Sequence, residues 1–400
     1  MKLRHYFTHY SSLGGVQSIL GTHLKYDGTA GLTPTLLAFF DSNVNRSGNE
    51  KVKGLNWHGL SSIQGARASF RQHEFDNQYD CCVYHDLWGL AFLADLDHCH
   101  YRIGAIHSHW PHLEFQLKQL DGFVDGVFCD SQALADLAIK CIPGLTPDRA
   151  IHLPVPIKTC PPKYRQTRTP LKGRPLKLGF VGRLDHLQKR VERFIPMVEC
   201  LDQRGIQYEL EFLGDGTARR TLENAFKGKD HIRMHGKKSG DDYWRILGTW
   251  DFVIYTSDFE GSPLAMQEAL NAGCIPIFPR INCGGDLVVE ELHSSLLYPQ
   301  EDYPAVASIL MDWSKRSNEF VEQIRKQAII LSSEYAEEKY HAKFMNFLTH
   351  ITSQPAISLH PVPSRSQTWT DYLPFSAIRR WCPKAFFKYQ TKQLVTNPDR

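Results

Sequence analysis

Two glutamates, Glu260 and Glu268, flank the start of a predicted helix and could bind a hydroxyl-rich ligand. Ser262 is suited to cap this helix, Pro263 to its first turn, and Gly273 to its end. Carboxylates accept strong hydrogen bonds from hydroxyl groups, so the pair predicts contacts with a sugar or a ribose. The alternative is a well-capped helix that carries two surface glutamates.

The same helix start could bind an anion. The backbone amides of Gly261, Ser262 and Leu264 would point out of the helix N-terminus, whereas Pro263 has no amide to donate. Free amides at a helix N-terminus bind phosphate groups. The segment therefore predicts a diphosphate site beside Glu260.

Two cations follow another predicted strand, which ends at Gly182. Arg183 and Lys189 lie six residues apart around the next turn. Fixed cations at the carboxyl end of a strand can hold a diphosphate and neutralise the charge that builds on a departing phosphate. The alternative is an ordinary solvated turn.

Glycine turns follow two further predicted strands. Gly14 and Gly15 come after the first strand of the chain, and Gly214 comes after a strand in the second half. Glycine lets a ligand approach the backbone closely, although most such glycines only form a turn.

Histidines follow two strands of the first half. His85 and Asp86 follow one strand, and His107 and His109 follow the next, so these side chains could reach a ligand. A metal site is the alternative, with additional candidate ligands at His98, His100, His112, Asp95 and Asp97. The spacing matches no compact zinc pattern and no cysteine pair supports one, so we expect no metal and two solvated aspartates.

The elements that position these residues alternate between short apolar strands and amphipathic helices. We expect strands at Leu3–Phe7, Leu36–Phe39, Cys81–Tyr84, Ile103–Ile106, Gly126–Cys129, Leu176–Val181, Tyr208–Leu213, His231–His235, Phe252–Tyr255 and Cys274–Phe278. Such alternation predicts parallel α/β sheets, whose ligands bind at the carboxyl ends of the strands. The sequence thus predicts two doubly wound Rossmann-like domains facing a cleft.

Length and composition agree with two domains. The chain has 400 residues, of which 42% are hydrophobic and 22% charged, with a net charge of +3. We place the first domain at 1–153, a Pro-rich linker at 154–175, the second domain at 176–350 and a tail at 351–400. Ten cysteines without a regular framework fit the reducing cytoplasm, and neither a secretion signal nor a membrane span is expected.

Taken together and in this order, the motifs resemble those of the family 4 glycosyltransferases, which have the GT-B fold. The resemblance extends over about residues 1–350 and is most specific at 176–300. It implies transfer of a sugar from a nucleotide-diphosphate-sugar donor, with retention of configuration and without a metal cofactor. A glycan or lipid-linked acceptor, polysaccharide or glycoconjugate synthesis, and no nucleic-acid partner are expected.

The resemblance also implies roles for residues. Glu260 would contact the donor sugar, with His85 beside it, while Glu268 would bind the ribose. Arg183 and Lys189 would hold the diphosphate.

The donor-binding glycines would be Gly14, Gly15, Gly182, Gly214 and Gly261. Asp86, His107 and His109 would lie on the acceptor side.

The sequence departs from the family pattern in two places. Arg183 and Lys189 are one residue farther apart than in the commonest spacing, and residues 86–88 form an unusual acceptor-side loop. Two other functions stay open: a nucleotide-sugar epimerase that hydrolyses its donor, and a non-catalytic sugar-nucleotide-binding protein.

The tail combines positive charge with aromatic residues. Residues 351–400 hold seven Lys or Arg against two Asp or Glu. We expect it either to pack across the first domain or to contact an anionic membrane through 361–400.

Overall fold

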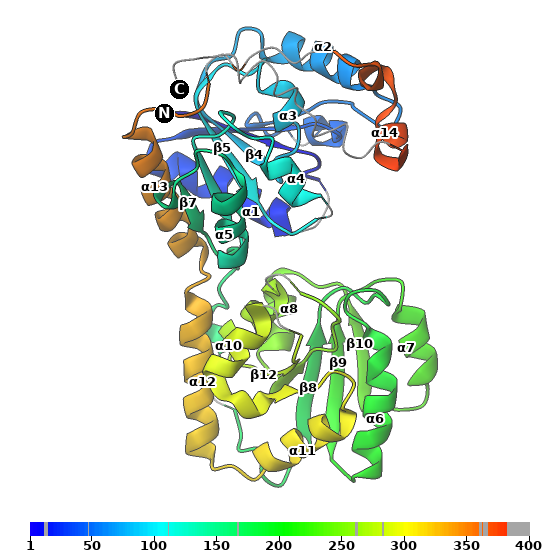
Figure 1. Ribbon diagram of the computed structural model, residues 1–400. Helices are drawn as coiled ribbons and strands as arrows, with labels where there is room; N and C mark the ends of the chain where they lie inside the picture. Colours follow the sequence, from blue (N-terminus) through cyan, green and yellow to red (C-terminus); the bar gives the residue numbers. More distant parts are fainter. Residues whose placement is uncertain are drawn as a thin grey trace. The chain divides into compact units, whose positions relative to one another are not determined.

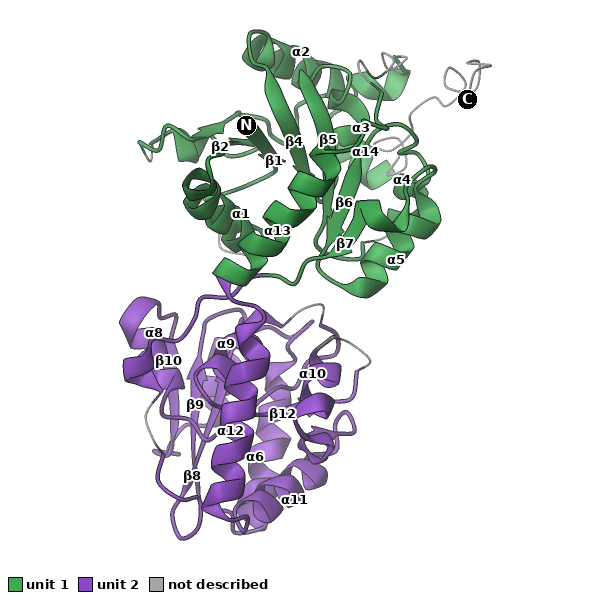
Figure 2. Ribbon diagram, turned by 90° about the vertical axis from the view of Figure 1, so that its left-hand side faces the viewer, with its two compact units in different colours: residues 1–155, 338–400 green, residues 156–337 purple. Residues whose placement is uncertain are grey.

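The computed structural model divides the chain into two compact units, shown in Figure 2: residues 1–155 with 338–400, and residues 156–337. It describes residues 1–11, 15–46, 48–110, 112–165, 168–260, 263–281, 284–359, 362 and 367–381. Among the site candidates, Gly14, Gly261 and Ser262 lie outside the described residues, as does the tail beyond Trp381.

Unit 1 is built on a parallel seven-stranded sheet of order β3-β2-β1-β4-β5-β6-β7. Its strands are β1 Lys2–Phe7, β2 Thr33–Ala38, β3 Val52–Gly54, β4 Tyr79–His85, β5 Cys99–Ile106, β6 Gly126–Cys129 and β7 Ala150–His152. Its α-helices are α1 Gly15–Tyr26, α2 Ile63–Glu74, α3 Leu90–Leu93, α4 Leu113–Leu117, α5 Gln132–Cys141, α13 Glu337–Thr352 and α14 Phe375–Trp381. Single helical turns include η1 Asp27–Ala30 and η7 Trp369–Tyr372.

Unit 2 repeats this plan with six parallel strands in the order β10-β9-β8-β11-β12-β13. These are β8 Leu176–Val181, β9 Tyr208–Leu213, β10 Ile232–Gly236, β11 Phe252–Ile254, β12 Ile275–Pro279 and β13 Leu297–Tyr298. Helices cover both faces (Figure 1): α6 Phe194–Gln203, α7 Arg219–Ala225, α8 Gly240–Leu247, α9 Leu264–Asn271, α10 Gly284–His293, α11 Tyr303–Trp313 and α12 Asn318–Ser333.

Both sheets therefore have the strand order of a Rossmann fold, which confirms the predicted α/β class. In unit 2 the central strand packs tightly against a buried indole, because a Cβ at Gly179 would lie 2.1 Å from the Trp250 ring. Such close packing between β8 and the Trp250 ring explains a glycine inside a strand.

The chain crosses between the units twice, which corrects the domain boundaries that we expected. Residues 338–350, placed in the second domain from the sequence, belong to unit 1. The reason is the apolar face of α13, where Phe344 packs its ring against His23 and Phe128.

The Pro-rich segment 154–175 is not a free linker either, because most of it packs on unit 2. Arg174 makes a two-pronged ion pair with Asp251 at 2.6 and 2.9 Å, and Arg168 donates to the carbonyl oxygen of Gly273. Arg168 and Arg174 thus fix the described part of this segment on the surface of unit 2.

The described part of the tail packs on unit 1. The amide of Phe375 donates to Ser61, and the Phe375 ring lies among Phe40, Trp57 and Trp88. Residues 382–400 lie outside the described part, so the membrane alternative stays a prediction.

In the described part of the chain, no helix combines the length and the apolar character that crossing a membrane requires.

Candidate active site

In unit 2 the strand order reverses between β8 and β11, and ligands of parallel α/β sheets bind at the carboxyl ends of the strands beside such a point. The loops after β8 and β11 are joined by hydrogen bonds. Thr256 donates through Oγ1 to the carbonyl oxygen of Lys189 at 2.8 Å, and the amide of Asp258 donates to Gln188 at 2.9 Å. The segments that carry the predicted cations and carboxylates therefore lie side by side.

Lys189 and Glu260 form an ion pair between these two loops. Lys189 Nζ lies 2.6 Å from Glu260 Oε1, and Ser257 Oγ donates to the same oxygen at 2.6 Å. The side chains are only 13% and 3% exposed, so water screens this pair weakly. Two residues predicted to bind the donor are thus held together in a fixed geometry.

Arg183 lies in a different environment from Lys189. Its side chain is 66% exposed and donates to Asp185 Oδ2 at 2.8 Å and to Gln188 at 2.9 Å. Because most of this guanidinium is open to solvent, it can turn toward an incoming anion.

Asp185 organises the turn between the two cations. Its Oδ1 accepts hydrogen bonds from the amides of Leu187, Gln188 and Lys189. Burial opposes ionisation, but these amides and the Arg183 guanidinium hold the pKa of Asp185 below its ordinary value. Arg190, directly after this turn, adopts a left-handed conformation with φ of 49°.

The glycines after β8 and β9 pack against each other. Gly214 has φ of 150°, and a Cβ there would lie 1.8 Å from the carbonyl oxygen of Gly182. The amide of Leu184 also donates to Asp215 at 2.9 Å. The two glycine turns therefore pack against each other. Their contact with a donor stays a prediction.

Helix α9 begins at Leu264, with Pro263 at the cap position. This corrects the expected start, which placed Pro263 inside the first turn. Leu264 therefore supplies the first helical amide of the predicted anion site.

Glu268 lies one turn further along α9 and is bonded by a residue that the sequence did not single out. Tyr243 on α8 donates through Oη to Glu268 Oε2 at 2.5 Å. Burial raises the pKa of Glu268 to about 6. Tyr243 was missed because its helix has an ordinary amphipathic pattern; no motif marks it.

In unit 1 His85, which we expected to reach a ligand, lies in the core, and its contact with a donor stays a prediction. Its side chain is fully buried, and its Nε2 and Nδ1 lie 3.0 and 2.8 Å from ring nitrogens of His5 and His107. Burial, reinforced by His107, holds the pKa of His85 well below its ordinary value.

The residues expected on the acceptor side differ in exposure. His107 is almost covered and bonds Asp130 at 2.9 Å, and Asp86 accepts from the His107 amide at 3.1 Å. His109 is exposed. Gly15 is the first residue of α1, so its predicted approach to the donor starts at a helix N-terminus.

Asp95 and Asp97 are not solvated, contrary to expectation. Arg67 binds Asp95 at 2.6 and 2.7 Å, and Arg102 binds Asp97 at 2.6 and 2.8 Å. Both carboxylates are buried in ion pairs, so they have structural partners in place of water.

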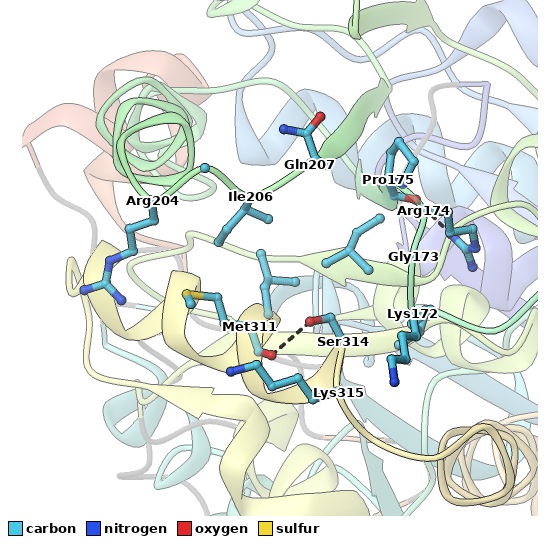
Figure 3. A pocket seen from close by; sticks show the side chains of 14 residues that line it. Lys172, Gly173, Arg174, Pro175, Arg204, Ile206, Gln207, Met311, Ser314 and Lys315 are labelled. Atoms are coloured by element: carbon cyan, nitrogen blue, oxygen red, sulfur yellow. Dashed lines mark hydrogen bonds between the residues drawn. The ribbon is translucent and has the colours of Figure 1, made fainter.

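Figure 3 shows a different feature of unit 2, a hollow of about 450 Å³. Pro175, which precedes β8, and Gln207, which precedes β9, line it, together with Met311 from α11. It therefore lies at the amino ends of the strands, opposite the edge that carries Lys189 and Glu260.

Comparison with known proteins gives these residues a family context. Residues 165–330 match the family model described as "Glycosyl transferases group 1". This segment contains Arg183, Lys189, Glu260 and Glu268.

A curated relative is the putative colanic acid biosynthesis glycosyltransferase WcaL of Salmonella typhimurium. The chain is 28% identical to it over 174 residues, which is 41% of this chain and 42% of that protein. The WcaL of Escherichia coli is 28% identical over 163 residues, covering 38% of this chain and 40% of the relative. The matched part thus spans about two fifths of the relatives' length.

Solved structures share the fold over most of the chain. The apo lipopolysaccharide outer core galactosyltransferase WaaB aligns with a TM-score of 0.63 and 15% identity, covering 87% of this chain and 99% of WaaB. Anabaena HepE in complex with UDP-glucose aligns with a TM-score of 0.64 and 15% identity, over the same shares. The predicted GT-B architecture of two Rossmann-like units is thereby confirmed.

Proposed function

We propose that this protein transfers a sugar from a nucleotide-diphosphate-sugar to a glycan or lipid-linked acceptor, with retention of configuration. The observation that carries the proposal is the buried Lys189–Glu260 pair beyond the carboxyl ends of β8 and β11, within the segment that matches the group 1 glycosyltransferase model. A cation for the diphosphate and a carboxylate for the sugar are adjacent at the expected edge of the sheet.

The proposed reaction breaks the bond between the anomeric carbon and the diphosphate oxygen. Positive charge then grows on the sugar ring and negative charge on the leaving diphosphate. Lys189, Arg183 and the N-terminal amides of α9 would stabilise the leaving group, and one well-placed donor of this kind contributes about 3 kcal/mol. These groups would allow the reaction to proceed without a metal ion.

The new bond forms between the acceptor hydroxyl oxygen and the anomeric carbon, on the face from which the nucleotide departs. A phosphate oxygen of the leaving group takes the hydroxyl proton, so atoms and charge balance without a protein nucleophile. Glu260 would orient the donor sugar. Glu268 would accept a ribose hydroxyl through Oε1, since Tyr243 occupies Oε2.

We further propose a role in polysaccharide synthesis, carried out by a cytoplasmic enzyme. Both curated relatives are described as colanic acid biosynthesis proteins. The HepE structure contains UDP-glucose, which makes UDP-sugars the first donors to test.

The tail offers a surface for a lipid-linked acceptor. Trp369, Tyr372 and Trp381 are 64–71% exposed. Leu60, whose chain neighbours bond Phe375 and Ser376, is 75% exposed. Arg379 and Arg380 lie in the last turn of α14. Aromatic and basic side chains together favour the interface of an anionic membrane.

Flotation with anionic liposomes tests this membrane contact. Truncation at Pro361 would remove Phe375 from the core, so the full chain with Trp369, Tyr372 and Trp381 all changed to Ser is the better variant. We expect the wild type to float and the variant to stay in the lower fraction. Equal flotation of both proteins would overturn the membrane proposal.

Product analysis tests the transfer itself. Donor is incubated with and without a glycan acceptor, and the products are followed by NMR. We expect an acceptor-dependent product whose anomeric configuration matches the donor's. An inverted product would overturn retention, and release of free sugar at the same rate without acceptor would indicate a hydrolase.

A further inference from the structure

Unit 1 contains a buried row of hydrogen-bonded histidines that the sugar-transfer chemistry does not use. His5 on β1, His85 at the end of β4 and His107 after β5 are joined through their ring nitrogens at 3.0 and 2.8 Å. Asp130 accepts from His107 at 2.9 Å at one end of the row. Beyond the other end lies Asp27, whose Oδ2 is 3.5 Å from His5 Nε2.

The protons of this row can be counted. Three neutral imidazoles carry three N–H groups, and three short links must be filled: His5 to His85, His85 to His107, and His107 to Asp130. Filling all three leaves His5 Nε2 as a bare lone pair. This atom is fully buried and has no hydrogen-bond partner, although it faces the Asp27 carboxylate. A lone pair facing a buried anion calls for a cation between them, either a proton on His5 or a metal ion.

A third ligand lies at the same place. His23 on α1 directs Nδ1 toward Asp27, at 3.2 Å from Oδ2. The coordinating atoms of His5, His23 and Asp27 all lie within 4.8 Å of one another, and the three side chains are buried. Zinc–ligand bonds of about 2.0–2.2 Å in a tetrahedron place neighbouring ligand atoms about 3.4 Å apart. The 3.2 and 3.5 Å separations fit that geometry.

We propose that His5 Nε2, His23 Nδ1 and Asp27 Oδ2 bind a structural divalent metal of the zinc type inside unit 1. Imidazole nitrogen and carboxylate oxygen are common zinc ligands, whereas Mg²⁺ and Ca²⁺ take oxygen ligands. This metal site lies in unit 1, whereas the proposed donor site around Lys189 and Glu260 lies in unit 2. The metal takes no part in the proposed sugar transfer.

The surroundings of these three ligands support the assignment. A metal-bound imidazole normally donates its other N–H to a fixed partner. His5 has His85 as that partner, and His23 Nε2 lies 3.0 Å from Tyr340 Oη. Asp27 Oδ1 lies 2.9 Å from His341 Nε2 on α13. Every ligand is thus oriented by a second group, and no imidazole needs an additional proton.

Such a metal would join segments distant in the sequence. His5 and His23 come from the first strand and the first helix, while Tyr340 and His341 come from α13, which returns from unit 2. The metal would therefore fasten the returning α13 helix onto unit 1, because its outer partners are on that helix.

Metal analysis of the full chain tests the proposal. Protein from a zinc-supplemented culture, freed of any affinity tag, is dialysed against metal-free buffer and assayed by mass spectrometry of its elements. We expect about one zinc per chain. Prolonged incubation with a strong chelator should lower Tm by about 5 °C or more, and zinc alone should restore it.

Variants locate the metal. His5→Gln and His23→Gln should each lose the zinc, whereas the exposed His98→Gln and His100→Gln should keep it. If the ligand variants do not fold, Co²⁺ added to the wild-type apoprotein provides a second readout, the visible absorption of a tetrahedral site. The proposal would be overturned by a metal-free protein whose Tm changes with neither zinc nor chelator. Loss of the metal from the His98 variant would also overturn it.

Discussion

At the scale of single residues, the central feature is that a lysine and a glutamate expected to bind one ligand are bonded to each other. Removing one partner of a buried pair leaves the other charge unpaired, which costs about 3 kcal/mol or more. Removing an exposed charge costs little. Lys189 and the 66% exposed Arg183 therefore allow stability to be separated from turnover.

We predict that Lys189→Met lowers the free energy of unfolding by about 3 kcal/mol, and that adding Glu260→Gln restores most of it. Arg183→Met should change it by less than about 0.5 kcal/mol. Both single variants should lower kcat by about 30-fold or more, because each removes charge at the leaving group. Denaturant titration and steady-state kinetics measure the two effects; a stable, fully active Lys189→Met protein would contradict the assignment.

Glu268 makes the stability of the protein depend on pH. Its pKa is about 6 in the folded protein and near 4.5 when unfolded, so the folded state binds the proton more tightly. This contribution of about 2 kcal/mol is fully present below pH 4.5 and is lost as the pH rises through 6.

We therefore expect Glu268→Gln to gain stability relative to wild type between pH 4.5 and pH 7, by up to about 2 kcal/mol. Urea unfolding at several pH values measures it. Glu209→Gln, at a half-buried glutamate of β9, is the matched control. A constant difference between Glu268→Gln and wild type over that range would contradict a raised pKa.

At the scale of elements, the turns after β8 and β9 pack directly against each other through Gly182 and Gly214. A Cβ at Gly214 would strike the carbonyl oxygen of Gly182, whereas a Cβ at Gly205, which also has a positive φ (67°), would meet nothing within 4 Å. We predict that Gly214→Ala destabilises the protein by about 3 kcal/mol and Gly205→Ala by about 1 kcal/mol. Denaturant titration compares them, and equal small losses would show that the packing is not required.

The elements also show what sequence reasoning can reach. The bounds of β8, β9 and β6 agree with the predicted ranges because each strand has a clear apolar pattern, alternating in β9 and nearly continuous in β6, that ends at a turn. The edge strands β3, β7 and β13 were not predicted. They have only two or three residues each, too few for a period to show.

The candidate site was predictable in part for the same reason. Lys189 and Glu260 come from short motifs, and the parallel sheet brings the motif loops to one edge. The burial of His85 and the role of Tyr243 depend on side chains from distant elements. His5, His23 and Asp27 form no short motif, so only the folded chain brings them together.

At the scale of the whole molecule, the charges of the donor site bear on metal dependence. Lys189, Arg183 and the α9 amides together would replace a dissociable ion at the diphosphate. We predict that turnover started in EDTA equals turnover without it, and that added Mn²⁺ brings no increase. Loss of activity in EDTA, with recovery in Mn²⁺, would show that the reaction needs an ion. The assay is kept short, so that EDTA does not remove the buried metal proposed for unit 1.

Binding of a nucleotide-sugar in unit 2 is the central claim, and a thermal shift panel measures it most directly. The full chain is heated with UDP-, GDP- and ADP-sugars, beside Glu268→Ala, in which the ribose contact is removed. We expect at least one donor to raise Tm by about 3 °C or more in wild type, with the shift lost in the variant. No shift from any donor, or the same shift in Glu268→Ala, would contradict the site.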